Sequence, residues 1–268
     1  MTSWTVAGSD RLTITEPVDR VVVRLDYARL NVVGTEGPAR IEISRPGRRP
    51  VLVEYRSGTL SVRQRGRWSW MELVRLVRRR VGPEVSIGVP PGTEVDLQLV
   101  TGTLLASGLT GSTRAEITSG QITLMGLRGR TSVKLVSGPV EALGVAGDLT
   151  METVSGELIL AEGTAERIQA RTVSGAITCD LDNPGESEID LATISGSVTV
   201  RVRRDSDLDV RLHATSGTIT SDFPELTVDG LRSWVGKRAQ GILGTGRGRL
   251  AVTAQSGSIT LLARATAE

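Results

Sequence analysis

A Ser-Gly or Thr-Gly pair recurs through much of the chain at a nearly constant interval. Two residues after each glycine stands Ile, Val or Leu. The glycines of these pairs are Gly102, Gly120, Gly138, Gly156, Gly175, Gly196, Gly217 and Gly257. Successive glycines are 18, 18, 18, 19, 21, 21 and 40 residues apart, and the last step is about two periods. A strand-like repeat of roughly 20 residues is the signature of a solenoid.

Apolar and polar residues alternate on both sides of each Ser-Gly pair. Before the pair at 155–156, Leu149 and Met151 are separated by polar residues, and Leu158 and Leu160 follow the pair in the same way. Alternation with period two places such residues on one face of a strand. The sequence therefore predicts an all-β fold, a single-stranded right-handed parallel β-helix (β-solenoid), with two short strands per coil.

The interval of the repeat divides the chain into two regions. The regular β-solenoid is predicted at 83–268, with an insertion at about 223–248, where proline and several glycines interrupt the spacing. Residues 1–82 alternate like short strands but lack the interval. They are predicted to form a short, irregular N-terminal β segment that includes one helix.

That helix is predicted from a segment with helical spacing. Ser69 and Glu72 fit a capping box, and Gly82 and Pro83 form a stop signal. Together they predict one amphipathic helix at about 69–81. It is expected to cap the open end of the solenoid, because an uncovered sheet edge is prone to aggregate.

The same segment is strongly basic, and this leaves a second role open for it. Four arginines, Arg75, Arg78, Arg79 and Arg80, stand against the single acid Glu72. A basic amphipathic helix can lie on an anionic membrane, so peripheral contact with such a surface is the alternative to capping. Nucleic acid is a disfavoured partner, because a net charge of +2 gives no broad basic field.

The residue types that carry most enzyme chemistry are scarce. Cys179 is the only cysteine and falls at an inward position, which favours a buried core residue over a nucleophile. His213 is the only histidine, and no second ligand stands near it in register. Outward carboxylates are scattered, whereas polysaccharide cleavage needs them clustered. No catalytic residue, metal site, cofactor or small-molecule substrate is therefore predicted.

The sequence carries no recognisable targeting signal. No run of about 18 apolar residues exists that would form a transmembrane helix. The first residues have neither the basic start nor the apolar stretch of a secretory signal. A cytoplasmic location is expected, with the basic helix as the place for any peripheral membrane contact.

One apolar column lies on the outward side of the predicted strands. Directly before the serine of four consecutive coils stand Val136, Val154, Val173 and Ile194. Monomers rarely leave a long apolar patch exposed. The column is therefore predicted either to bind a protein partner or a second copy of the chain, or to be tucked inward by a bend at the corner.

The repeat resembles a known bacterial family. The motif Val-x-Ile-x-Val-Pro-x-Gly at 85–92 precedes the repeated Ser-Gly pairs, and Gly-x-Gly-x-Gly at 244–248 precedes Gln-Ser-Gly-Ser-Ile at 255–259. These motifs resemble the β-strand-repeat putative adhesins, a domain family of unknown function, over about residues 83–262. The resemblance implies a β-solenoid without enzymatic activity and supplies no catalytic residues.

These observations together predict a non-enzymatic binding or scaffold protein of adhesin-like type, with an unknown ligand. The first alternative is a self-assembling β-helical filament or a membrane-surface scaffold subunit. A carbohydrate-active β-helix enzyme is the least favoured class, because the outward carboxylates form no column.

Overall fold

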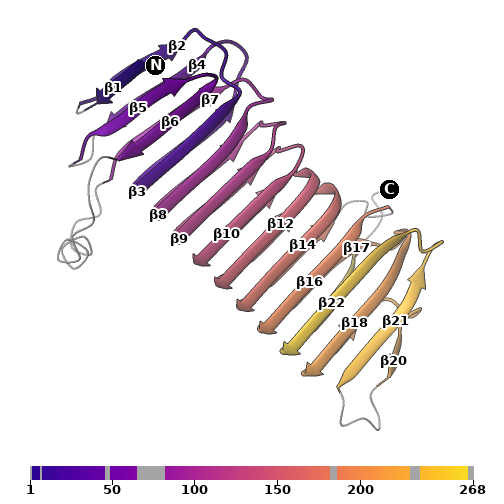
Figure 1. The fold of residues 1–268 in the computed structure, drawn as a ribbon. Helices are drawn as coiled ribbons and strands as arrows, with labels where there is room; N and C mark the ends of the chain where they lie inside the picture. The colour runs from indigo at the N-terminus through magenta and orange to yellow at the C-terminus, as the bar shows by residue number, and fades with distance from the viewer. Residues whose placement is uncertain are drawn as a thin grey trace, which may run out of the picture. The chain divides into compact units, whose positions relative to one another are not determined.

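The structure, a computed structural model of the 268-residue chain, contains only β-strands as regular elements in the part that it describes (Figure 1). This confirms the all-β class. The helix predicted at about 69–81 lies outside the described residues. The described residues are 2–6, 8–45, 49–64, 82–181, 186–229 and 236–264.

The chain divides into two compact units, and the division falls inside the strand β9. Unit 1 comprises Met1–Thr123 and Leu127–Gly129, and unit 2 comprises Leu124–Gly126 and Arg130–Glu268. The boundary predicted at residue 83 is a different one, because it marks where the regular repeat begins. It stays a prediction.

Unit 1 combines antiparallel strands with parallel ones. β6 and β7 pair in parallel with the first and second parts of β3. β5 and β4 pair antiparallel with β6 and β7, and β1 and β2 pair antiparallel with β5 and β4. These changes of direction explain why residues 1–64 alternate like strands but lack the interval. The strands are β1 (Thr2–Val6), β2 (Asp10–Ile14), β3 (Arg20–Gly34), β4 (Ala39–Arg45), β5 (Val51–Arg56), β6 (Thr59–Gln64), β7 (Glu84–Val89), β8 (Glu94–Ser107) and β9 (Thr113–Met125), which continues into unit 2.

The strand β3 is itself a coil in register with the repeat. It pairs in parallel with β8 along nearly its whole length, and Ala28 lies opposite Gly102 at the corner. The glycine spacing gives no sign of this coil, because its corner has Tyr27-Ala28 where later coils have Ser-Gly or Thr-Gly.

In unit 2, each regular coil contributes one strand to each of two faces. β10, β12, β14 and β16 stack in parallel on one face, and β11, β13, β15 and β17 on the other. The fold is therefore a β-solenoid, and its right-handed sense stays a prediction. The strands are β10 (Thr131–Ser137), β11 (Val140–Leu143), β12 (Ala146–Ser155), β13 (Leu158–Ala161), β14 (Thr164–Ser174), β15 (Ile177–Leu181), β16 (Glu188–Ser195), β17 (Val198–Arg203), β18 (Leu208–Ser216), β19 (Ile219–Ser221), β20 (Thr227–Asp229), β21 (Lys237–Leu243), β22 (Gly248–Ser256) and β23 (Ile259–Arg264).

The inward residues of unit 2 form stacked apolar columns. Cys179 lies in one of them, between Leu160 and Val200 of the neighbouring coils, and is 1% exposed. Burial raises the pKa of its thiol to about 12, because a thiolate is poorly solvated in an apolar interior. The prediction that Cys179 is a buried core residue is confirmed.

At the end of unit 2, the order of the coils in space differs from their order in the chain. β22 lies between β16 and β18 and pairs in parallel with both (Figure 1). β23 lies between β17 and β19 in the same way. The interrupted region 223–248 contains β20 and β21, and β21 pairs antiparallel with β18. The last coil is thus enclosed by two coils that precede it in the sequence.

A tight turn directs the chain from β21 into β22. Gly244 and Gly246 have φ angles of 58° and 70°, which glycine adopts without steric cost. The Asp207 carboxylate accepts a hydrogen bond from the backbone N–H of Thr245 at 2.7 Å and another from Arg247 at 2.8 Å. Both interactions favour the charged carboxylate and lower the pKa of Asp207. The glycine-rich stretch therefore serves a turn.

The glycines of the Ser-Gly corners approach one another closely. A Cβ on Gly156 would lie 1.9 Å from the carbonyl oxygen of Gly138, and one on Gly175 would lie 1.8 Å from that of Gly156. In unit 1, a Cβ on Gly120 would lie 1.8 Å from the carbonyl oxygen of Gly102. No side chain fits at such distances, so the close approach of successive coils requires glycine at these three corners.

Replacing a corner glycine is expected to destabilise the fold. Gly156→Ala should lower the free energy of unfolding by more than about 2 kcal/mol, because the backbone of the neighbouring coil must move away. Gly92→Ala is the matched control, since a Cβ there meets no atom within 4 Å, and it should change stability by less than about 0.5 kcal/mol. Urea unfolding measures both, and equal effects would contradict the corner assignment.

Cys179 is expected to react slowly with a thiol reagent while the protein is folded. The thiolate is the reactive form, and burial both disfavours the thiolate and excludes the reagent. Modification followed by absorbance at about pH 8 should be at least 100-fold faster, roughly, in denaturing urea than in native buffer. Rapid labelling of the folded protein would show that Cys179 is outside the core.

Asp207→Asn is expected to lower stability at neutral pH but not in acid. Because the pKa of Asp207 is lowered in the folded state, its contribution is present above the pKa of the unfolded chain and is lost as the pH falls. The difference in unfolding midpoint between wild type and variant should therefore shrink between about pH 6 and pH 2. Asp190→Asn, at an exposed aspartate outside the turn, is the control. A difference that does not change with pH would rule out this role.

Candidate functional site

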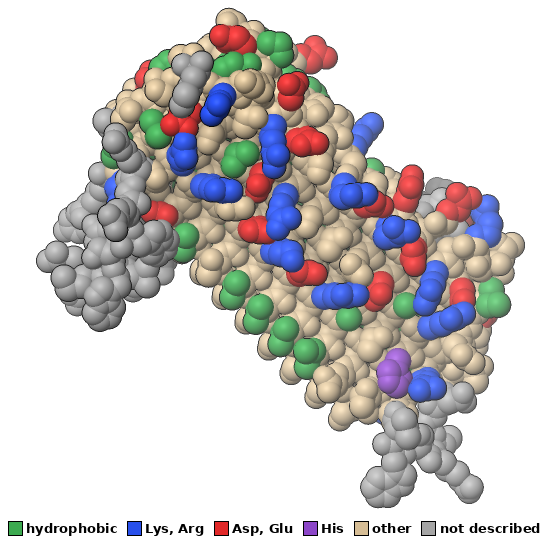
Figure 2. Space-filling view, viewed as in Figure 1, with side chains coloured by type: hydrophobic (Ala, Val, Ile, Leu, Met, Phe, Trp, Pro, Cys, Tyr) green, Lys and Arg blue, Asp and Glu red, His purple; other side chains and the backbone are tan. Residues whose placement is uncertain are grey.

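Four aliphatic side chains form a row on the outer side of unit 2. We call Val136, Val154, Val173 and Ile194 the aliphatic stripe; they are 48%, 49%, 44% and 50% exposed. Figure 2 shows hydrophobic side chains in a row along the edge where β10, β12, β14 and β16 end. This exposure excludes the bend that would have tucked the column inward. The use of the stripe as an interface stays a prediction.

The parallel register aligns the four side chains of the stripe. In each of the four strands, the stripe residue lies between two residues that pair directly with the equivalent residues of the next strand. Adjacent strands lie about 4.8 Å apart, so the stripe is about 14 Å long. The next strand in space is β22, which carries Gln255 at this position, followed by Thr215 of β18. Thr215 follows Ile194 in the order of the coils along the chain, but β22 lies between β16 and β18 in space.

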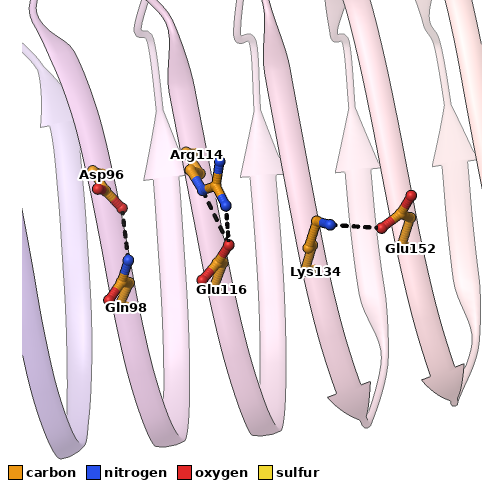
Figure 3. A network of polar contacts seen from close by, with 6 residues as sticks. All are labelled: Asp96, Gln98, Arg114, Glu116, Lys134 and Glu152. Atoms are coloured by element: carbon orange, nitrogen blue, oxygen red, sulfur yellow. Dashed lines mark hydrogen bonds and ion pairs between the residues drawn. The ribbon is translucent and has the colours of Figure 1, made fainter.

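A charged column runs beside the stripe on the same face. It consists of Lys134, Glu152, Arg171 and Ala192, each two residues before a stripe residue. The ammonium group of Lys134 lies 3.0 Å from the Glu152 carboxylate, and Figure 3 shows the two side chains pointing toward one another. Arg171 is exposed and has no ion-pair partner among the residues that the structure describes. These flanking charges were not singled out from the sequence.

Other outward acids of the two units are held by arginines. In unit 1, Arg114 donates to Glu116 at 3.0 Å (Figure 3), and this hydrogen bond raises the pKa of Arg114. In unit 2, a hydrogen bond from Arg201 lowers the pKa of Asp180. Glu116 and Asp180 are thus each held by an arginine, and they do not form the acid and base pair that glycoside cleavage requires.

The single histidine is half-buried on one face of unit 2. His213 of β18 faces Thr253 and Arg238 on its two neighbouring strands. Its ring nitrogen Nε2 lies 3.5 Å from the Thr215 hydroxyl. Among the described residues, no cluster of three or more His, Cys, Asp or Glu side chains is arranged to hold a metal ion.

A hollow of about 550 Å³ lies in unit 1 and is large enough for a small molecule. It is lined by Asp19, Arg20, Glu94 and Thr93, together with Val18, Pro90 and Gly92. The Thr93 hydroxyl is buried and already donates to the carbonyl of Val18 at 3.1 Å. Charges of both signs and a satisfied hydroxyl give this hollow no convergent set of groups for one ligand.

The basic residues Arg75, Arg78, Arg79 and Arg80 lie outside the described residues, so their contact with an anionic surface stays a prediction. In the described part of the chain, no helix has the length and apolar character needed to span a membrane.

Two solved structures of bacterial proteins are similar to this chain. A putative adhesin from Bacteroides fragilis has a TM-score of 0.51 and 11% identity, over 95% of this chain and 97% of that one. A putative lipid binding protein from Parabacteroides distasonis has a TM-score of 0.44 and 10% identity, over 95% and 97% of the two chains. No curated protein sequence matches this chain significantly.

The family is established by the sequence match. The model of the Toastrack DUF4097 family matches residues 33–262, which extend from the end of β3 into β23. The matched region includes every Ser-Gly pair and the enclosed last coil, so it covers the features that define the fold. The resemblance inferred from the repeat is confirmed, and this chain belongs to the Toastrack DUF4097 family.

Proposed function

We propose that this protein is a non-enzymatic binding or scaffold protein and that the aliphatic stripe is its contact surface. The observation that carries the proposal is the stripe itself. Four neighbouring aliphatic side chains remain about half exposed, while the inward residues of the same strands are almost completely buried. Folding has placed the other large aliphatic side chains of β10, β12, β14 and β16 in the core, so the exposed row has a use outside the fold.

Covering the stripe is energetically favourable. Full burial of a valine or isoleucine side chain contributes about 1.5–3 kcal/mol, and roughly half of that remains available at each position. Four such positions in one line give several kcal/mol of gross driving force, before the cost of association is subtracted. A partner with a flat, continuous aliphatic surface would bury the four side chains most completely and so obtain most of this free energy.

The charged surface argues for binding over catalysis. Outward acids such as Glu116 and Asp180 are paired with arginines, and the buried thiol of Cys179 has a raised pKa. The similar fold of a putative adhesin concerns architecture alone at 11% identity. Because that similarity says nothing of function, the proposed binding role depends on the exposed stripe and not on the comparison.

The filament alternative requires coils to stack end to end in the parallel register of the solenoid. In unit 1, β1 and β2 pair antiparallel with β5 and β4. In unit 2, β21 pairs antiparallel with β18, and β20 pairs antiparallel with β21. Because these strands leave the parallel register, lateral contact through the stripe is favoured over end-to-end growth.

The proposal is tested by site-specific photocrosslinking in the cells that produce the protein. A photoreactive amino acid at Val154 or Val173 should give covalent adducts with a protein partner, because the partner covers these side chains. The matched control sites are Thr150 and Gln169, which lie on the same two strands and also point outward. Adducts from the stripe but not from the control sites support the proposal. Absence of stripe adducts from a protein with unchanged melting temperature would contradict it.

A further inference from the structure

We propose that the aliphatic stripe binds the stripe of a second copy of this chain, in an antiparallel two-fold arrangement. This inference depends on the proposed function, because it names the partner of the same surface. Two observations support it: the constant spacing of the stripe, and the order of the charges beside it.

A second copy has a surface whose spacing matches the stripe. Each stripe residue is separated from the next by one strand spacing, about 4.8 Å, because the coils are held in register by parallel pairing. An identical row has the same spacing, so each side chain of one copy can meet a side chain of the other along the whole stripe. Such a contact uses one surface twice, as two-fold symmetric dimers do.

The antiparallel arrangement is fixed by symmetry. A two-fold axis perpendicular to the stripe reverses its direction in the second copy. Val136 then lies opposite Ile194 of the second copy, and Val154 lies opposite Val173 of the second copy. The same operation places the charged column of one copy beside the charged column of the other.

The two charged columns are complementary in this arrangement. Glu152 faces Arg171 of the second copy, and Arg171 faces Glu152 of the second copy. Lys134 faces the uncharged Ala192. Arg171 has no ion-pair partner among the described residues of its own chain, and the side chain of Glu152 is 40% exposed although it also pairs with Lys134. A carboxylate accepts several hydrogen bonds, so Glu152 can pair with both cations.

The parallel alternative brings like charges together. If the two-fold axis instead runs along the stripe, the two stripes are parallel. The charged column of one copy then meets the outward residues that follow the Ser-Gly pairs in the second copy. Glu152 would then face the exposed Glu157 of the second copy, twice in each dimer. Like charges at close range disfavour this arrangement. In the antiparallel dimer, Glu157 faces the uncharged Ala176.

The size of the stripe predicts a weak dimer. Stable interfaces bury about 800 Å² on each partner, and four half-exposed side chains with their flanks supply less than that. A dissociation constant of about 10 μM to 1 mM is therefore expected. Because the flanking ion pairs are exposed, added salt should weaken the dimer.

The test is sedimentation equilibrium of the purified full chain and of two charge variants, at concentrations up to about 1 mM. Wild type should dimerise. Glu152→Arg and Arg171→Glu should each weaken self-association by about 10-fold or more, because each homodimer would then contain two like-charged pairs. An equimolar mixture of the two variants should recover the dimer, since each variant complements the other. Thr150→Arg, on the same strand as Glu152, is the control and should dimerise like wild type.

Melting temperatures establish that each variant is folded, and mixing distinguishes charge pairing from general damage. A wild type that stays monomeric at about 1 mM would overturn the inference. So would a dimer that ignores both charge variants, a mixture that does not recover, or growth into larger assemblies. If the purified chain is monomeric but the stripe still crosslinks to another protein in cells, the proposed function holds and this inference fails.

Discussion

The close approach of backbone at the Ser-Gly corner is the constraint on which the rest of unit 2 depends. The carbonyl oxygen of each corner glycine occupies the space that a Cβ of the next corner glycine would need. The corner therefore locks successive coils into one register. That register stacks the inward residues into columns, encloses Cys179 and lines up the stripe. A slip by one residue would turn the apolar columns outward and bury the charged ones, so a glycine column protects both the core and the surface.

Much of this architecture follows from the sequence, because glycine spacing and two-residue alternation are local signals. They predicted the coil, its two strands, the buried position of Cys179 and the outward direction of Val154. Two features carry no local signal. The coil formed by β3 has Ala28 where the later coils have the corner glycine, so the glycine spacing does not reveal it. The enclosed position of β22 depends on its pairing with β16 and β18, which are distant in the sequence. The 40-residue interval between Gly217 and Gly257 would look the same if one coil had merely lost its Ser-Gly pair.

The candidate site shows the same division between local and long-range information. Alternation placed Val136 and its equivalents on the outer side, but whether the corner buried them depended on its three-dimensional shape. The importance of Glu152 and Arg171 could not be foreseen either. Each is an ordinary outward charge in the sequence, and only their order beside the stripe makes them complementary to a second copy.

A repetitive surface can usually be bound by its partner in several registers. The order of the charges beside the stripe disfavours all but one of them. Sliding the antiparallel partner by one coil in one direction places Glu152 against Glu152 and Lys134 against Arg171. Sliding it in the other direction places Arg171 against Arg171. Each slip leaves aliphatic contacts but creates like-charge pairs, so only the central register satisfies both columns. A short stripe with an asymmetric charge column thus defines a single closed dimer, whereas a longer uncharged stripe would permit sliding and open-ended assembly.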